Sequence, residues 1–265
     1  MRRMICWLFG HRWTPWIYGL SFTGPMVART CKTMSYIRRK EKHTVIALIA
    51  AKGNSERVPE KNTRPFADTN LLQLKIEQLK ESEAFDEIVV SSESEKILGI
   101  AVGCGATPWE RNPSLSRPET PMSEVYEALA DRIRAAYGNV PLAWVQCNNP
   151  LVDAEYYGRA AVAYRHMTSA YDCLLSVHRV HEYLINDGQP ANFERSPWSR
   201  SQDLPPLYAM NFAICILRAK DMVDWQSLVG ERPFLFEIPR ADAIDIDWPE
   251  DFAYCEAEYK RRKGL

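Results

Sequence analysis

The stretch TVIALIAAKGNSERVPEKN (residues 44–62) joins a continuous apolar run to a polar loop with one glycine, one proline and three cations. A short, partly β-branched apolar run without alternation is typical of a strand buried on both faces of a sheet. In parallel sheets, ligands bind in the loops at the carboxyl ends of the strands. The stretch therefore predicts a buried parallel strand that leads directly into a ligand-binding loop.

Strand and helix patterns alternate along the rest of the chain. Apolar runs that predict buried strands lie at residues 44–50, 86–92, 106–109, 141–147 and 171–178, and helical patterns lie between them at residues 70–82, 94–102, 122–138 and 153–166. Asn70 and Asp153 are expected to cap two of these helices, and Gly138 is expected to end a third. The alternation predicts an α/β fold with a Rossmann-like, mostly parallel sheet and helices on both faces.

The alternation breaks at residues 179–208, a stretch that contains four prolines, Pro190, Pro197, Pro205 and Pro206, and little periodicity. This pattern predicts a small excursion from the sheet. Strand and helix patterns then resume at residues 212–222 and 233–239, and a last helix is expected at residues 249–263, with Pro249 in its first turn.

Charge divides the chain into two parts. The whole sequence of 265 residues has a net charge of −1, so no overall basic field attracts nucleic acid. Residues 1–42 nevertheless carry nine Lys or Arg against one acid, and three of the eight Trp. We expect a basic, Trp-rich N-terminal extension (residues 1–42), poorly ordered by default. Contact with nucleic acid or another protein stays open for it, as does a zinc site at Cys6, His11 and Cys31, which lacks a fourth ligand.

Cysteine usage and hydropathy predict the compartment. The seven cysteines are dispersed and form no CxxC pair, which favours a reducing cytoplasm over a disulfide framework. No apolar run approaches the length of a membrane span. The expected protein is therefore cytoplasmic and has no contact with a membrane.

The loop after the first strand has the composition of a polyphosphate site. Lys52, Arg57 and Lys61 supply positive charge, and Gly53 allows a close approach of the backbone. No GxxxxGK occurs, so the loop is not a Walker loop. The alternative is an ordinary solvated surface loop.

A second chemical signal is AIDIDWPEDF (residues 243–252). Asp245 and Asp247 lie two apart in an extended stretch, so both side chains point the same way. Two adjacent carboxylates repel each other unless a cation lies between them, and Mg²⁺ shared with substrate phosphates suits such a pair. The alternative is that one or both aspartates cap the last helix.

Four motifs together resemble the acylneuraminate cytidylyltransferases, or CMP-sialic acid synthetases. The loop AAKGNSERVPEKN is similar to their A-R-x-x-S-K-x-x-P-x-K-N, and WVQCNNPLVD (residues 144–153) to L-Q-P-T-S-P-L-R. SRSQDLPPLYAMNFAICI (residues 199–216) resembles R-x-Q-D-L-P-x-x-Y-x-x-N-G-A-I-Y, and IDIDWPEDF resembles I-D-I-D-x-x-x-D-F. The four occur in the family's order across roughly residues 43–260. The resemblance implies a cytidylyltransferase-like domain at residues 43–265, with a nucleotide-diphospho-sugar transferase-like fold.

The resemblance also implies a reaction and its residues. The hydroxyl of an acidic sugar would attack the α-phosphate of CTP, and pyrophosphate would leave, with Mg²⁺ bridging the phosphates. Nucleotide contacts are expected from Lys52, Gly53, Asn54, Ser55, Arg57, Lys61, Asn62, Arg111 and Gln146. Acceptor contacts are expected from Gln146, Asn148, Arg200 and Gln202. Lys52, Lys61 and Asp245 are the expected catalytic residues, Asp245 and Asp247 the expected metal ligands, and the excursion at residues 179–208 the expected homodimer contact.

Several positions depart from the family's pattern. The leading Arg is Lys52, the Lys after Ser55 is Glu56, and the Gly after Asn211 is Phe212. Thr-Ser of the second motif is Asn148–Asn149, and its Arg is Val152. The phosphate and metal residues are thus largely kept, while positions on the sugar side differ. The alternative function is a non-catalytic nucleotide-binding or assembly protein derived from the same fold.

Overall fold

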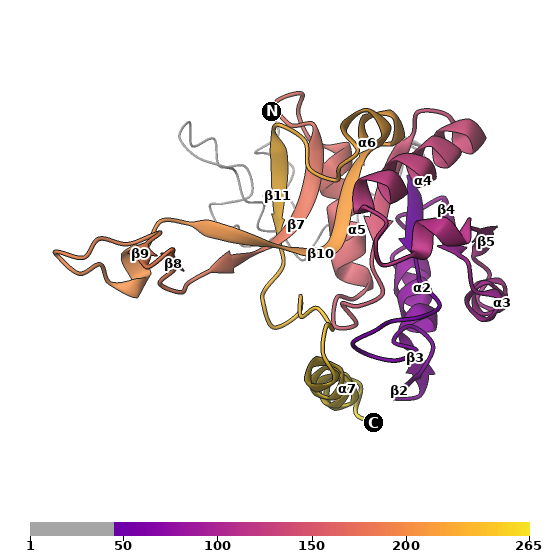
Figure 1. The fold of residues 1–265 in the computed structure, drawn as a ribbon, viewed down its shortest axis with the longest axis horizontal. Coiled ribbons are helices and arrows are strands. Elements are labelled where there is room, and N and C mark those ends of the chain that lie inside the picture. The colour runs from indigo at the N-terminus through magenta and orange to yellow at the C-terminus, as the bar shows by residue number, and fades with distance from the viewer. Residues whose placement is uncertain (1–44) are drawn as a thin grey trace, which may run out of the picture.

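The structure is a computed structural model and describes residues 45–265, so the expected N-terminal extension and its candidate zinc ligands lie outside the described residues. A seven-stranded sheet forms the centre, in the order β11-β7-β10-β6-β1-β4-β5 (Figure 1). Its strands are β1 (Ile46–Ala50), β4 (Glu87–Ser92), β5 (Thr107–Glu110), β6 (Pro141–Val145), β7 (Cys173–Val180), β10 (Leu207–Arg218) and β11 (Pro233–Glu237). Among these seven, only β10 runs antiparallel to its neighbours. The prediction of a mostly parallel sheet is confirmed.

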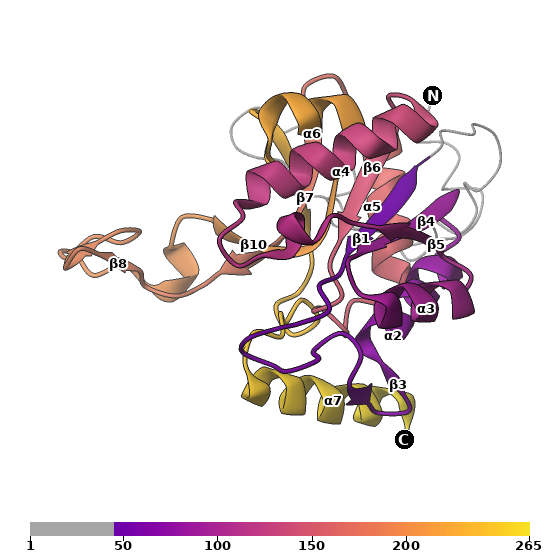
Figure 2. The same cartoon turned by 45° about the vertical axis from the view of Figure 1, so that its right-hand side comes forward.

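Helices cover both faces of the sheet, because successive residues of each buried strand point to opposite sides. Ala47 and Ile49 of β1 pack in a core with α2 (Leu71–Glu81), α3 (Glu95–Gly103) and α5 (Ala154–Arg165). Ile46 and Leu48 pack in a second core with α4 (Met122–Tyr137) and α6 (Ala219–Trp225). Figure 2 shows α4 and α6 on one side of the sheet and α2 and α3 on the other.

The expected helix ends are confirmed. The side chain of Asn70 accepts a hydrogen bond from the Gln73 N–H and caps α2, and Asp153 caps α5 by accepting from the N–H groups of Glu155 and Tyr156. Gly138 ends α4 with a positive φ of 83°, a conformation that glycine adopts without strain.

The excursion at residues 179–208 is an arm that projects from the sheet, formed by the outer ends of β7 and β10 and by the short hairpin β8 (Ile185–Asn186) and β9 (Gln189–Pro190) (Figure 1). Asp187 and Gly188 join the two short strands with positive φ values of 48° and 72°, the conformation that suits a two-residue hairpin turn. Three aromatic rings, of Tyr183, Phe193 and Trp198, pack together on the arm.

The last helix, α7 (Pro249–Lys263), lies beyond the edge of the sheet, beside the short hairpin β2 (Pro65–Phe66) and β3 (Thr69–Asn70) (Figure 2). Phe66 attaches this hairpin to α7, with ring centroids 5.4 Å from Phe252 and 5.5 Å from Tyr259. No helix of the described residues is long and apolar enough to cross a membrane.

Candidate active site

A cleft of ≈ 500 Å³ opens at the carboxyl ends of β1 and β6. The loop after β1 (residues 51–64, called the β1 loop below) forms one wall, and residues 144–148 form another. The cleft brings together nine of the expected site residues: Lys52, Asn54, Ser55, Arg57, Lys61, Asn62, Arg111, Gln146 and Asn148. Glu56, the charge reversal in the family's motif, also lines the cleft and is exposed.

Gly53 of the β1 loop faces the protein rather than the cleft. Its N–H donates a 2.7 Å hydrogen bond to Oε1 of Glu93, just after β4. A Cβ at this position would lie 2.7 Å from Cβ of Ser94, so any larger residue would push the loop outward. Gly53 therefore lets the β1 loop approach the end of β4. This close approach fixes the backbone position of the neighbouring Lys52.

Glu93 joins three segments around the cleft. Besides the Gly53 N–H, it accepts hydrogen bonds from Nη2 of Arg111 at 2.9 Å and from Oγ of Ser116 at 2.5 Å. Burial by itself raises the pKa of Glu93, but the hydrogen bonds from Ser116, Gly53 and Arg111 outweigh it and lower the pKa to about 2. Arg111 is only 3% exposed and also donates to the Ala51 carbonyl at 3.2 Å. Arg111, one of the expected nucleotide contacts, is thus held rigidly at the cleft.

Two loop cations lie against the segment that carries the aspartate pair (residues 243–248, the aspartate segment). Nζ of Lys61 donates to the Ile246 carbonyl at 2.7 Å and lies 4.0 Å from Oδ1 of Asp247. Nη2 of Arg57 lies 2.9 Å from the same carboxylate oxygen, and its guanidinium stacks over the Trp248 ring at 5.3 Å. The expected phosphate loop and the expected metal pair are therefore one site.

Asp245 and Asp247 flank Ile246, which is fully buried in the core, while both aspartates are only partly buried. Burial, followed by the charge of Asp247, raises the pKa of Asp245 to about 6. Oδ1 of Asp245 is buried and accepts no hydrogen bond. A buried carboxylate oxygen without a donor, beside a second carboxylate, has the chemistry of a cation ligand.

The alternative role of the pair, as caps of α7, is not observed: the N-cap residue is Trp248, and Asp251 in the first turn of the helix bonds back to the residues before it. Oδ2 of Asp251 accepts the N–H groups of Asp247 at 3.0 Å and Trp248 at 2.8 Å. No group of three or more His, Cys, Asp or Glu side chains suited to a metal occurs within residues 45–265. A cation between Asp245 and Asp247 would therefore complete its coordination with water and substrate oxygens.

Arg200 and Gln202 do not line the cleft. They lie on the arm, in the short turn η3 (Ser201–Asp203) and directly before it, and Arg200 pairs with Asp203 at 2.6 Å. Their expected contact with an acceptor stays a prediction, and it requires the cleft of a second subunit.

Glu93 was not among the site residues expected from the sequence. Its position in the sequence could have identified it as a site residue. An acid directly after a parallel strand lies at the edge of the sheet where ligands bind.

Comparisons with known proteins identify relatives of this chain. A family model described as Cytidylyltransferase matches residues 46–195. Pseudaminic acid cytidylyltransferase of Campylobacter jejuni is 26% identical over 81% of this chain and 96% of its own length. CMP-N,N'-diacetyllegionaminic acid synthase of Legionella pneumophila is 29% identical over 80% and 94%.

Solved structures share the fold at low sequence identity. CMP:2-keto-3-deoxy-manno-octonic acid synthetase matches with a TM-score of 0.62 at 13% identity, over 83% of this chain and 99% of the other. A 4-diphosphocytidyl-2C-methyl-D-erythritol synthase matches with a TM-score of 0.61 at 15% identity, over 82% and 99%. The family match spans more than half of the sequence and includes the β1 loop and the strand-end residues of the cleft, and the chain belongs to the cytidylyltransferase family.

Proposed function

We propose that this protein transfers CMP from CTP to a sialic-acid-like sugar acid, in a Mg²⁺-dependent reaction that releases pyrophosphate. The observation that carries the proposal is the contact of Asp247 with Lys61 and Arg57, two cations that line the cleft, while Asp245 lies two residues away and is influenced by the charge of all three. Curated relatives that cover most of the chain are named for pseudaminic, legionaminic and acylneuraminic acids, which supports this class of acceptor.

In the proposed reaction, the acceptor hydroxyl attacks the α-phosphorus of CTP and loses its proton. A new oxygen–phosphorus bond forms, the bond from the α-phosphorus to the bridging oxygen of the β-phosphate breaks, and pyrophosphate leaves. Transfers of this type depend on positioning and charge neutralisation more than on covalent help from the protein. Lys52 and Lys61 would neutralise the triphosphate, with Ser55, Asn54 and Asn62 as hydrogen-bonding neighbours.

Asp245 and Asp247 would hold the divalent cation. When bound, the ion supplies Lewis-acid stabilisation of the charge that builds on the phosphate oxygens. The fit rests on the unpartnered oxygen of Asp245 and on the two carboxylates side by side. Lys61 and Arg57 already balance part of this charge, and both also line the cleft that would hold the triphosphate.

The acceptor side of the site would include a second copy of the chain. Trp198 on the arm is 63% exposed, an unusual state for a large apolar ring, and it sits in a packed aromatic cluster. Docking of two arms would bury this cluster in a homodimer. The same arrangement would carry Arg200 and Gln202 to the partner's cleft. In that cleft, Gln146 and Asn148 would lie beside the bound nucleotide.

A pyrophosphate-release assay tests the proposal directly. The protein is incubated with each of the four NTPs, with and without Mg²⁺, against a panel of sialic-acid-like sugar acids, and the CMP-sugar is identified by mass. We expect product with CTP only, and loss of most of it after Asp245→Asn. If CTP binds but no acceptor yields pyrophosphate, the alternative of a non-catalytic nucleotide-binding protein replaces the proposal.

A further inference from the structure

Helix α2 presents a buried lysine to the loop that follows β6 (residues 146–152, the strand-end loop). Lys75 is fully buried, and no carboxylate of the described residues pairs with it. Its Nζ instead donates to the carbonyls of Asn149 at 2.9 Å and Val152 at 3.3 Å, and to the Tyr157 hydroxyl at 2.6 Å. Burial lowers the pKa of Lys75 to about 7, and these three acceptors replace part of the water that its amine loses.

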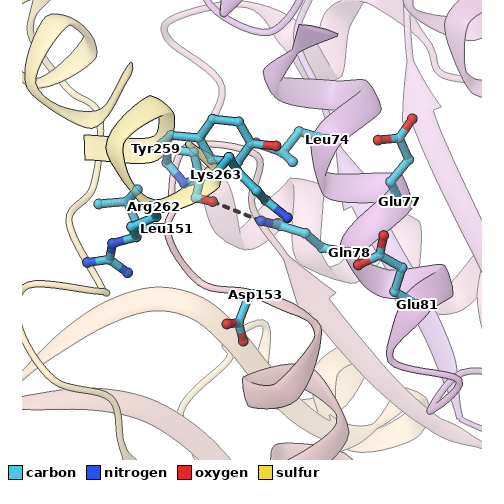
Figure 3. Close-up of a pocket in the computed structure, with 10 residues that line it drawn as sticks. Leu74, Glu77, Gln78, Glu81, Leu151, Asp153, Tyr259, Arg262 and Lys263 are labelled. Atoms are coloured by element: carbon cyan, nitrogen blue, oxygen red, sulfur yellow. Dashed lines mark hydrogen bonds between the residues drawn. The ribbon is translucent and has the colours of Figure 1, made fainter. Parts of the chain in front are cut away.

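Gln78, one turn further along α2, binds the same loop. Its Nε2 donates to the Pro150 carbonyl at 2.8 Å, and Figure 3 shows the side chain crossing from the helix toward this loop. Together, Lys75 and Gln78 bind three of the loop's carbonyls, those of Asn149, Pro150 and Val152. The strand-end loop is therefore attached rigidly to α2.

The strand-end loop in turn holds the aspartate segment. The Asn149 side chain is fully buried, and its Nδ2 lies 3.1 Å from the Asn211 carbonyl, 3.3 Å from that of Ala243 and 3.4 Å from that of Ile244. The Ile246 N–H donates to the Asn148 carbonyl at 2.8 Å. Both neighbours of Asp245 in the chain are thus bound to consecutive residues of one loop.

We propose that Asn149 and Lys75 are positioning residues that fix the backbone on both sides of Asp245 and thereby set the affinity of the aspartate pair for a divalent cation. The inference rests on the proposed function, since it assumes that Asp245 and Asp247 are metal ligands. It also explains the departure from the family's pattern at residue 149. A serine hydroxyl is shorter and has one hydrogen to donate, whereas the amide has two and reaches the carbonyls of Asn211 and the aspartate segment.

The test measures metal binding apart from turnover. Mn²⁺ serves as the probe and is titrated in the presence of CTP without acceptor, with the unbound ion followed by electron paramagnetic resonance. We expect Asn149→Ser and Lys75→Met each to weaken Mn²⁺ binding by about tenfold, the lower end of the loss seen when residues that orient metal ligands are removed. Excess Mg²⁺ should restore most of the turnover, which it would not do for a variant that is merely less stable.

Asn192→Ser is the matched control. Asn192 is equally an asparagine with a buried side chain that binds backbone groups, but it lies on the arm, where it joins Leu184 and Glu182. This variant should bind Mn²⁺ like the unchanged protein. A folded Asn149→Ser or Lys75→Met protein with unchanged Mn²⁺ affinity would overturn the inference.

Hydrogen exchange on the unchanged protein gives a reading that needs no variant. The Ile246 amide should exchange as slowly as the amides of β1, because its bond to Asn148 belongs to the same rigid unit. Fast exchange at Ile246 would overturn the inference. If the unchanged protein binds no Mn²⁺ at all, the proposed function fails instead. The experiment therefore distinguishes failure of the positioning inference from failure of the proposed function.

Discussion

Replacing Glu93 by glutamine should loosen the cleft and destabilise the protein at neutral pH. The Glu93 carboxylate accepts hydrogen bonds from the Gly53 N–H at 2.7 Å, from Arg111 at 2.9 Å and from Ser116 at 2.5 Å. Glutamine has the same shape, but one of its two terminal groups is a donor. At least one of the three donors would then face another donor, and the charge opposite the buried guanidinium of Arg111 would be lost.

The expected loss of unfolding free energy follows from the pKa of Glu93. Hydrogen bonds from Ser116, Gly53 and Arg111 overcome the effect of burial and lower the pKa of Glu93 from 4.5 to about 2. Each unit of pKa is worth about 1.4 kcal/mol, so the ionised form contributes about 3 kcal/mol to the free energy of unfolding. Because the folded pKa is the lower one, this contribution is complete above about pH 4.5 and is lost as the pH falls toward 2.

Urea unfolding of Glu93→Gln and the unchanged protein, followed at several pH values, checks both the size and the sign. We expect a loss of about 2–3 kcal/mol at pH 7 that shrinks steadily below pH 4.5. Glu60→Gln is the control, because Glu60 pairs with Lys96 on the exposed surface and its loss should leave unfolding unchanged. Equal stability of Glu93→Gln and the unchanged protein at pH 7, or a difference that does not depend on pH, would refute the reasoning.

Three further results are expected. Lys61→Ala should weaken CTP binding by about 1.5–3 kcal/mol in calorimetry, the value of a charged hydrogen bond, and unchanged affinity would remove Lys61 from the triphosphate site. Asp245→Asn should abolish most turnover yet leave the Tm without Mg²⁺ equal or higher. The reason is that burial and Asp247 raise the pKa of this carboxyl to about 6, so its negative charge is unfavourable in the metal-free protein. A lower Tm would indicate a structural role for Asp245. Trp198→Ala should convert a dimer to a monomer in light scattering at micromolar concentration, and an unchanged mass would exclude the arm's aromatic cluster as the dimer contact.

Most of the fold could be predicted from the sequence, because its strands are buried on both faces. Such strands are continuously apolar, and TVIALIA and PLAWV stand out against the amphipathic helices between them. The arm was recognisable for a related reason: prolines and missing periodicity exclude it from a sheet buried on both faces. Its observed limits, where β7 ends at Val180 and β10 begins at Leu207, lie within two residues of the predicted ones.

The order of the strands and the buried polar contacts could not be predicted in this way. Apolar runs indicate that β10 is buried, but nothing in its own pattern shows that it enters the sheet antiparallel between β6 and β7. Lys75 looks like a solvated residue of an amphipathic helix, because a lysine is rarely buried without a carboxylate. Two of its three partners are backbone carbonyls of a loop 74 and 77 residues away, and the sequence does not reveal which carbonyl a side chain will bind.

Two departures from the family's pattern, Asn149 and Phe212, meet at one peptide group. Phe212 has a positive φ of 54° at the irregularity in β10 between Met210 and Cys215, a conformation that costs about 1 kcal/mol in any residue but glycine. The family's glycine would adopt it without strain. The carbonyl of the peptide that joins Asn211 to Phe212 accepts a hydrogen bond from Nδ2 of Asn149 at 3.1 Å.

Because the Asn149 amide binds both this strained strand and the carbonyls that precede Asp245, its hydrogen bonds help to hold the strand in the conformation that the family reaches with glycine. The Phe212 ring in turn packs against the core formed by α4 and α6. We therefore expect the two substitutions to be coupled, which a double-mutant cycle can measure. Asn149→Ser should cost less stability in a Phe212→Gly background than in the unchanged protein, and strictly additive losses would mean that the two sites changed independently.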